Sequence, residues 1–361
     1  MSLFGKYLQV IFELVLNPIS MKNVNPTKHL AILILCSLVL ISCDDEYPSP
    51  KGYKYNQGDL PDSPVNLEDF NSVYDDYNIT APSRGAFVAF CFSTNRKSNG
   101  NEFDVIYEPM NINFSKTTGD LTVTNDYANN YYLAENYGVI RNGLNKINTL
   151  GNEFGPYLIP EYDFDDLFFT LLYASDVTGN FQINYTSNKS DTDFSDIKPI
   201  EFLNSEFDDL YPTFNSDRSK IYFCSNRDND KFDIYYTNTN NPENELELIL
   251  SDTSAHIISK DAIISSTSDD KCPFVYDDTL IFASNRDGGF GGFDLYYCKL
   301  ENDKWGEPIN FGSKINSEFD EYRPILIDED VSDTETMMVF SSNRNGGKGG
   351  FDLYYVGVII E

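Results

Sequence analysis

Short apolar runs separated by turns follow one another along most of the chain, and two of them flank a stretch that occurs twice. Residues 283–297 and 341–355 agree at twelve of fifteen positions and lie 58 residues apart. The run before each copy (280–282 and 338–340) and the aromatic run that ends it suit a pleated, half-buried strand. Glycines between the runs allow the positive φ values of a reversal. Each copy therefore predicts a β-hairpin.

The same hairpin recurs three more times, at 223–236, at 92–107 and at 173–185. The copy at 173–185 is degenerate, because it lacks both the Arg and the Asp of the others. An acidic turn followed by a strand precedes each copy, most clearly at 204–212 and 316–324, where the strand contains a proline. We expect that strand to line a central channel. Repeats of this size, with no long amphipathic helical period after the N-terminus, indicate an all-β fold built from similar sheets.

The ends of the repeat region predict how the sheets close. A short strand pattern at 64–67 precedes the first repeat, whereas the last repeat ends without an outer strand. Pairing these two segments would close a ring and remove the open edges. We therefore predict a β-propeller closed by an N-terminal strand. Between residues 108 and 138 the distance between successive repeats is about 20 residues longer than elsewhere. A further blade needs roughly 40 residues. Five blades with an insertion are therefore favoured over six.

Three polar positions recur in the hairpins and are predicted to be a structural motif. We expect Arg286 to face Asp294 across its turn, and Arg344 to face Asp352, as charge-assisted hydrogen bonds. The motif residues are Asn95, Arg96, Asp104, Asn226, Arg227, Asp233, Asn285, Arg286, Asp294, Asn343, Arg344 and Asp352.

With its acidic turn, this motif resembles the WD40-like repeats of TolB-type bacterial envelope propellers. The resemblance covers residues 64–361 and is strongest in the last three repeats. It implies a propeller that acts in the cell envelope.

The N-terminal region predicts where in the cell envelope the protein is located. A basic stretch from Met21 precedes an apolar core at 30–41 and then Cys43, and this ending resembles a bacterial lipobox. The resemblance implies that residues 1–42 are a signal peptide, that Cys43 carries lipid, and that 43–62 is a tether before the propeller at 63–361. We expect translation to start at Met21 and the protein to be anchored in the outer membrane of a Gram-negative bacterium; the leaflet stays open.

Composition narrows the partners. The formal charge is -31, which repels nucleic acid and anionic lipid surfaces. With 27 Phe and 25 Tyr the chain can build a core. We expect an envelope protein partner, membrane contact through the lipid on Cys43, and no nucleic acid; a glycan ligand stays open.

Candidate chemistry is sparse. The glycine-rich turns lack a following Lys-Ser/Thr and a helix, so they predict no phosphate site, and we expect no cofactor and no metal site. His256 is predicted to be a solvated loop residue. The four cysteines after Cys43 are predicted to be free and buried, and a Cys272–Cys298 disulfide stays open. Asp75, Asp208, Asp269 and Asp320 recur in nearly every repeat, whereas a catalytic carboxylate is usually singular.

These observations favour a lipid-anchored, non-catalytic propeller that serves as a protein-interaction scaffold, and we expect no enzymatic activity. The alternative is a surface glycan-binding protein or glycosidase of a polysaccharide-use system, with Tyr and Phe platforms at the channel mouth. Trp305 is the only tryptophan and lies in an outer connection.

Overall fold

The computed structural model describes residues 52–84, 87–125, 131–163, 166–189, 193–228, 230–239, 245–327, 332 and 335–360. The chain divides into two units, Met1–Tyr53 and Lys54–Glu361, and all the strands and helices described here belong to the second. The predicted signal peptide and Cys43 lie outside the described residues. Within the described ranges, no helix combines the length and apolar character that crossing a membrane requires.

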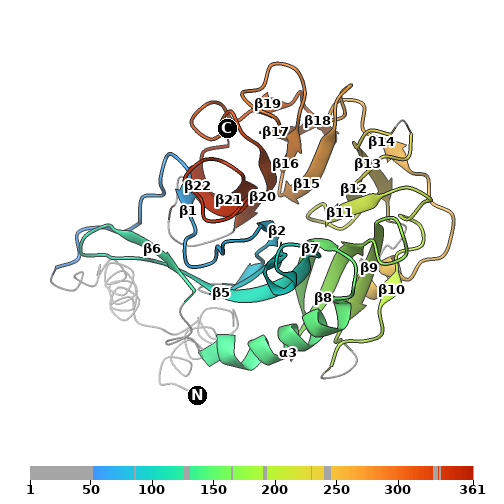
Figure 1. Ribbon diagram of the computed structural model, residues 1–361, viewed down its shortest axis with the longest axis horizontal. Helices are drawn as coiled ribbons and strands as arrows, with labels where there is room; N and C mark the ends of the chain where they lie inside the picture. The colour runs from blue at the N-terminus through green and yellow to red at the C-terminus, as the bar shows by residue number, and fades with distance from the viewer. Residues whose placement is uncertain are drawn as a thin grey trace, which may run out of the picture. The chain divides into compact units, whose positions relative to one another are not determined.

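Five antiparallel sheets surround a common axis, and each sheet places one strand innermost (Figure 1). The innermost strands are β2 (Asp76–Thr80), β7 (Glu153–Asp163), β11 (Asp209–Phe214), β15 (Asp270–Tyr276) and β20 (Glu321–Ile327). The second strands are β4 (Phe87–Thr94), β8 (Asp166–Ser175), β12 (Lys220–Ser225), β16 (Thr279–Ser284) and β21 (Thr336–Ser342). The third are β5 (Asp104–Phe114), β9 (Gln182–Ser187), β13 (Asp233–Asn238), β17 (Asp294–Glu301) and β22 (Asp352–Val358).

The outer strands are short and complete five blades, which confirms the predicted fold class. They are β6 (Leu121–Thr124), β10 (Lys198–Pro199), β14 (Ser259–Lys260), β19 (Ile309–Asn310) and β1 (Val65–Asn66). Two further short strands, β3 (Ser83–Arg84) and β18 (Lys304–Trp305), pair with β4 and β17. The predicted hairpins are the second and third strands of each blade.

The ring closes as the sequence predicts. β1 pairs antiparallel with β22 of blade five, with Val65 opposite Tyr355 and Asn66 opposite Tyr354. The last blade therefore takes its outer strand from the N-terminal side of the first blade, and no open edge remains between the two ends of the repeat array.

A repeated polar contact joins neighbouring blades. The backbone N–H of the Phe before each third strand donates to an Asp or Asn side chain of the next blade. These pairs are Phe103 to Asn152, Phe181 to Asp208, Phe232 to Asp269, Phe293 to Asp320 and Phe351 to Asp75. Since the last pair crosses the junction of the two chain ends, it reinforces the closure made by β1.

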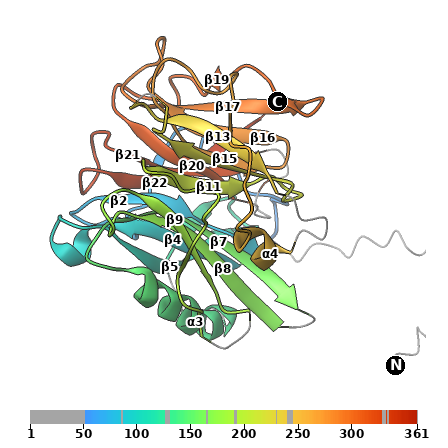
Figure 2. The same cartoon turned by 90° about the vertical axis from the view of Figure 1, so that its right-hand side faces the viewer.

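Blade one carries the insertion. Helix α3 (Tyr131–Ile147) lies beside β5 and β8 (Figures 1 and 2), and Ile140, Leu144 and Ile147 are buried against them. The sequence did not predict this helix. A short helix, α4 (Leu246–Leu250), covers part of blade three, and the 3-10 turn η3 (Arg96–Ser98) lies in the loop after β4.

The hydrophobic core is divided among the faces between blades. Separate buried clusters lie between blades five and one, one and two, two and three, and three and four. A further cluster lies between blades four and five and extends to the axis. Apolar burial contributes roughly 25 cal/mol per Å², so each blade is stabilised mainly by its two neighbours.

Candidate functional site

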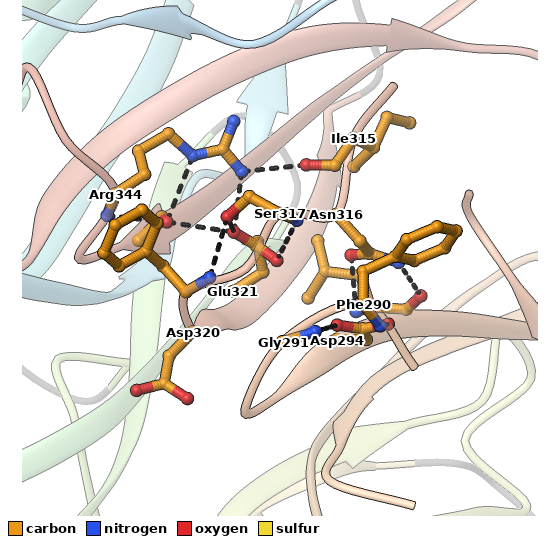
Figure 3. Close-up of polar contacts among 12 residues, drawn as sticks. Phe290, Gly291, Asp294, Ile315, Asn316, Ser317, Asp320, Glu321 and Arg344 are labelled. Carbon is orange, nitrogen blue, oxygen red and sulfur yellow. Dashed lines mark hydrogen bonds and ion pairs between the residues drawn. The ribbon is translucent and has the colours of Figure 1, made fainter. Parts of the chain in front are cut away.

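In four of the five blades the repeat motif forms a largely buried polar cluster at the start of the inner strand. In blade five, Arg344 Nη2 donates to Glu321 Oε1 at 2.9 Å and to the Ile315 carbonyl at 2.8 Å (Figure 3). Nε of the same arginine donates to Ser342 Oγ at 3.1 Å. The same arrangement joins Arg96 to Asp76, Arg227 to Asp209 and Arg286 to Asp270.

The predicted acid partners of Arg286 and Arg344 were therefore wrong. Asp294 instead accepts the backbone N–H groups of Phe290 (2.7 Å) and Gly291 (3.1 Å), and so shapes its own glycine loop (Figure 3). Asp352 accepts from Lys348 and Gly349 in the same way. The sequence analysis predicted that each arginine pairs with the aspartate across its hairpin turn. In the structure the arginine pairs instead with the acid that begins the inner strand of its own blade.

The remaining motif residues hold the backbone or pair with lysine side chains. The side-chain oxygens of Asn95, Asn226, Asn285 and Asn343 accept the N–H of Asp75, Asp208, Asp269 and Asp320. Asp104 lies 3.4 Å from Lys97, and Asp233 pairs with Lys260. These contacts suit a structural motif. They also show that Asp75, Asp208, Asp269 and Asp320 hydrogen-bond to other parts of the propeller backbone and its motif residues.

Blade two departs from the motif. Glu153 begins its inner strand, fully buried, at the position where the other blades pair an acid with arginine. Its carboxylate accepts from Thr149 Oγ1 at 2.6 Å and from Ser175 Oγ at 2.9 Å. Burial raises the pKa of the Glu153 carboxyl above its ordinary value, while these hydrogen bonds oppose the rise.

His256 is not the solvated residue that the sequence predicts. Its side chain is 2% exposed and stacks on Phe202, with ring centroids 4.1 Å apart. Nε2 lies 2.9 Å from Asp252 Oδ2. The aromatic neighbour comes from the end of blade two, which sequence proximity could not reveal. The hydrogen bonds from Ser254 and His256 lower the pKa of Asp252 to about 2.

The cysteines are free and buried, as expected. Cys91, Cys224, Cys272 and Cys298 have no disulfide partner among the described residues. Burial raises the pKa of the Cys272 and Cys298 thiols to about 12. Buried, neutral thiols are poor nucleophiles, so they act as small core residues.

Aromatic side chains crowd the axis at the end that carries the glycine loops. Tyr77 lies 5.0 Å from Phe351 and 5.4 Å from Tyr322, measured between ring centroids. Phe154 lies 5.0 Å from Phe103 and 5.2 Å from Phe181. These rings pack against one another and fill this end of the channel.

A cavity opens at the opposite end of the axis, where the inner strands finish. Its volume is about 260 Å³, and four of the five blades line it. Tyr157, Phe274 and Tyr276 provide aromatic walls, all three partly exposed. Thr80 Oγ1 accepts the N–H of Leu158 at 3.3 Å, which leaves the hydroxyl hydrogen to donate. No charged side chain among the described residues lines this cavity.

A second cavity, of about 340 Å³, lies between β5 and α3. Arg96, Lys97, Glu108 and Arg141 line it. Burial raises the pKa of the Glu108 carboxyl, and the nearby Arg96 opposes the rise. Two of its cations are already paired, Arg96 with Asp76 and Lys97 with Asp104. These two cations therefore already serve the frame of blade one.

Comparisons with known proteins concern the fold. No protein-family model matches the chain, and no curated protein sequence is similar to it. An α-L-arabinofuranosidase from Podospora anserina, solved in complex with cellotriose, is 13% identical, with 82% of this chain and 98% of that chain covered and a TM-score of 0.46. The GH43B protein of a Bacteroides ovatus xyloglucan PUL is 15% identical, covering 82% and 55%, with a TM-score of 0.46. An exo-β-1,3-galactanase from Clostridium thermocellum is 12% identical, covering 82% and 62%, with a TM-score of 0.44.

These findings correct the sequence-based assignment. The predicted relationship to TolB-type propellers is wrong, and so are the non-catalytic scaffold role and the absence of enzymatic activity that accompanied it, because the solved structures of similar architecture are glycoside hydrolases. The physical reason is that the repeated Asn, Arg and Asp residues determine the geometry of each blade and do not indicate which ligand the protein binds. Likeness at this identity concerns the fold, so the function has to be argued from the cavities.

Proposed function

We propose that this propeller recognises a neutral oligosaccharide in the cavity at the end of its axis opposite the glycine loops. The observation that carries the proposal is the cavity lined by Tyr157, Phe274 and Tyr276. Sugar rings present C–H faces that pack on aromatic rings, and hydroxyl groups that need hydrogen-bond partners. The partly exposed aromatic walls and the Thr80 hydroxyl supply both kinds of contact.

The charge of the ligand follows from the lining. A protein with a formal charge of -31 repels acidic ligands. The described walls of the cavity hold no cation that would offset this repulsion. An uncharged ligand is therefore favoured over a phosphorylated or uronic acid one.

The size of the cavity limits how much of a chain it takes. Ligand cavities typically measure about 300–1,000 Å³, and this one is about 260 Å³. We expect the terminal units of an oligosaccharide to enter, with the rest of the chain outside. Trp305 takes no part, because it is buried and donates its Nε1–H to Tyr222 Oη at 3.1 Å.

A glycan array followed by calorimetric titration tests the proposal. Phe274→Ala removes an aromatic wall and is expected to weaken binding of a neutral oligosaccharide by about tenfold or more, equivalent to about 1.4 kcal/mol. Phe290→Ala is the matched control, because Phe290 is half-exposed on a glycine loop at the other end. Equal losses in the two variants, or no neutral glycan bound by the wild type, would refute the proposal. Reducing ends released from the bound glycan would add catalysis to recognition.

Anchoring through Cys43 stays a proposal of its own. The basic stretch, the apolar core and the following cysteine support acylation there. Mass spectrometry of the protein from bacterial membranes is expected to find a diacylglycerol on Cys43, and Cys43→Ser is expected to release the protein from the membrane fraction. A mature chain that begins elsewhere would contradict it.

A further inference from the structure

The axis of the propeller holds a buried cation. Each inner strand places one residue with positive φ on the axis side of a bulge: Asn78, Gly155, Tyr211, Cys272 and Arg323, with φ between 46° and 57°. Non-glycine residues in this region of φ cost about 1–3 kcal/mol and call for a compensating contact. Arg323 is 0% exposed. Its guanidinium remains charged, because arginine does not lose its proton inside proteins.

The contacts of Arg323 do not balance this charge. Its terminal nitrogens donate to the carbonyls of Pro273 at 3.2 Å and Pro156 at 3.4 Å. The ring of Tyr211 lies 5.3 Å from the guanidinium carbon. Nε has no partner, and no ion pair joins Arg323 to an acid among the described residues.

Neighbouring groups do not supply a negative charge either. Burial raises the pKa of the Cys272 thiol to about 12, and it raises the pKa of the Tyr211 and Tyr322 hydroxyls well above their ordinary values. All three are therefore neutral near pH 7. An uncompensated buried charge costs several kcal/mol, which a packed protein avoids by pairing it.

A second buried group, on the inner strand of the neighbouring blade, is also unsatisfied. Asn78 is fully buried, and neither its Nδ2 nor its Oδ1 has a hydrogen-bond partner. Asn78 follows Tyr77 and Arg323 follows Tyr322, and these two tyrosine rings lie 5.4 Å apart. The two unpartnered groups therefore belong to neighbouring inner strands at the same level of the axis. Buried polar groups in native proteins are nearly always satisfied by a partner, a water or an ion.

We propose that a small monovalent anion, of the size of chloride, binds on the propeller axis between Arg323 and Asn78. Arg323 Nε–H and the Asn78 amide N–H₂ are the donors, and the arginine supplies the charge. The site is proposed for a monatomic anion because the side chains of Tyr77, Tyr211 and Tyr322 crowd the axis at this level and exclude a larger one. The anion would fix the inner strands of blades five and one, where the ring closes.

Thermal unfolding in matched salts tests this site on the full-length protein. Sodium gluconate replaces sodium chloride at equal ionic strength, so that general screening is constant. A ligand that binds only the folded state raises stability with its concentration, so the melting temperature is expected to be higher in chloride and in bromide than in gluconate. Equal melting temperatures in the three salts would overturn the proposal.

Asn78→Asp provides the sharper variant. It places a carboxylate on the neighbouring inner strand at the level of Arg323, without a change of size, and Asp tolerates the left-handed backbone of this position. We expect N78D to melt higher than the wild type in gluconate and to lose its dependence on chloride. Arg218→Met, which breaks an outer ion pair with Glu161, is the control and should keep the dependence. An N78D protein that still responds to chloride would contradict the site.

Crystals of the wild type grown in sodium bromide give an answer that does not depend on any variant folding. The expected result is an anomalous bromide peak within hydrogen-bond reach of Arg323 Nε and Asn78 Nδ2. Density there without an anomalous signal would identify water and refute the anion.

Discussion

At the scale of the residue, each motif arginine joins several buried groups of its blade, although part of its own side chain reaches the surface. Each donates to a fully buried carboxylate, to a backbone carbonyl and to a hydroxyl, which belongs to Thr94 for Arg96 and to a serine for the other three. Arg286 also lies over the rings of Phe282 and Tyr296, 5.1 and 5.0 Å from their centroids. Such a pair is costly to break because the remaining charge stays buried.

Removal of one motif arginine should therefore destabilise the propeller strongly. Arg286→Met leaves the Asp270 carboxylate buried without its cation, and we expect a loss of about 3–5 kcal/mol in the free energy of unfolding. Urea denaturation measures it. Lys314→Met is the control, since its pair with Asp62 is exposed on both sides and should contribute little. Similar losses in the two variants would show that the motif pair is not buried in solution.

Glu153 predicts a dependence of stability on pH. Its pKa is raised in the folded state, so the folded protein binds this proton more tightly than the unfolded chain does. Stability should therefore fall as pH rises from the unfolded value, near 4.5, through the raised folded value.

The variant Glu153→Gln removes that titration. Relative to the wild type, its free energy of unfolding should increase with pH across this window, as measured by denaturation at several pH values. A difference between the two proteins that stays constant from pH 4 to pH 7 would mean that Glu153 titrates normally.

The sequence predicted which residues form the motif but not how they pair. Asn, Arg and Asp recur in register, so their shared structural role was visible. The acid that each arginine contacts lies 16 to 23 residues upstream in the same blade. A signal was present, since an acid begins every inner strand. Only the folded sheet shows that this acid, and not the one across the turn, lies under the guanidinium.

At the scale of the element, helix α3 is the part of the fold that sequence reasoning missed. Gly138 and Gly143 lower its intrinsic helix propensity. Its apolar positions Ile140, Leu144 and Ile147 nevertheless follow a helical spacing and pack on blades one and two. The stretched repeat spacing therefore reflected a helix on the outside of the ring and not a sixth blade.

The two glycines of α3 give a matched pair of substitutions. A Cβ at Gly143 would lie 2.7 Å from the buried ring of Phe194, whereas at Gly138 nothing lies within 4 Å. Gly138→Ala should stabilise the protein by about 0.5–1 kcal/mol through helix propensity. Gly143→Ala should destabilise it, because the ring has to move. Equal effects in urea denaturation would contradict the docking of α3 on Phe194.

At the scale of the whole molecule, the ring and its closure were predictable, because a missing outer strand at one end and a spare one at the other leave a single economical pairing. The alternative hypothesis placed Tyr and Phe side chains at the channel mouth, but the residues that line the cavity were not predictable. Its walls, among them Thr80, Tyr157 and Phe274, come from the ends of different inner strands, and no motif marks them. The interpretation of the repeats as those of a TolB-type protein-interaction scaffold failed for the related reason that the repeated residues determine the geometry of the blades and not the ligand.

The most direct test of the proposed function is a crystal structure of the wild-type protein soaked with a neutral oligosaccharide that it binds in solution. The account predicts sugar density in the axial cavity, stacked against Phe274 or Tyr276 and within hydrogen-bond reach of Thr80. Sugar density at the glycine-loop end of the ring, or beside α3, would contradict it.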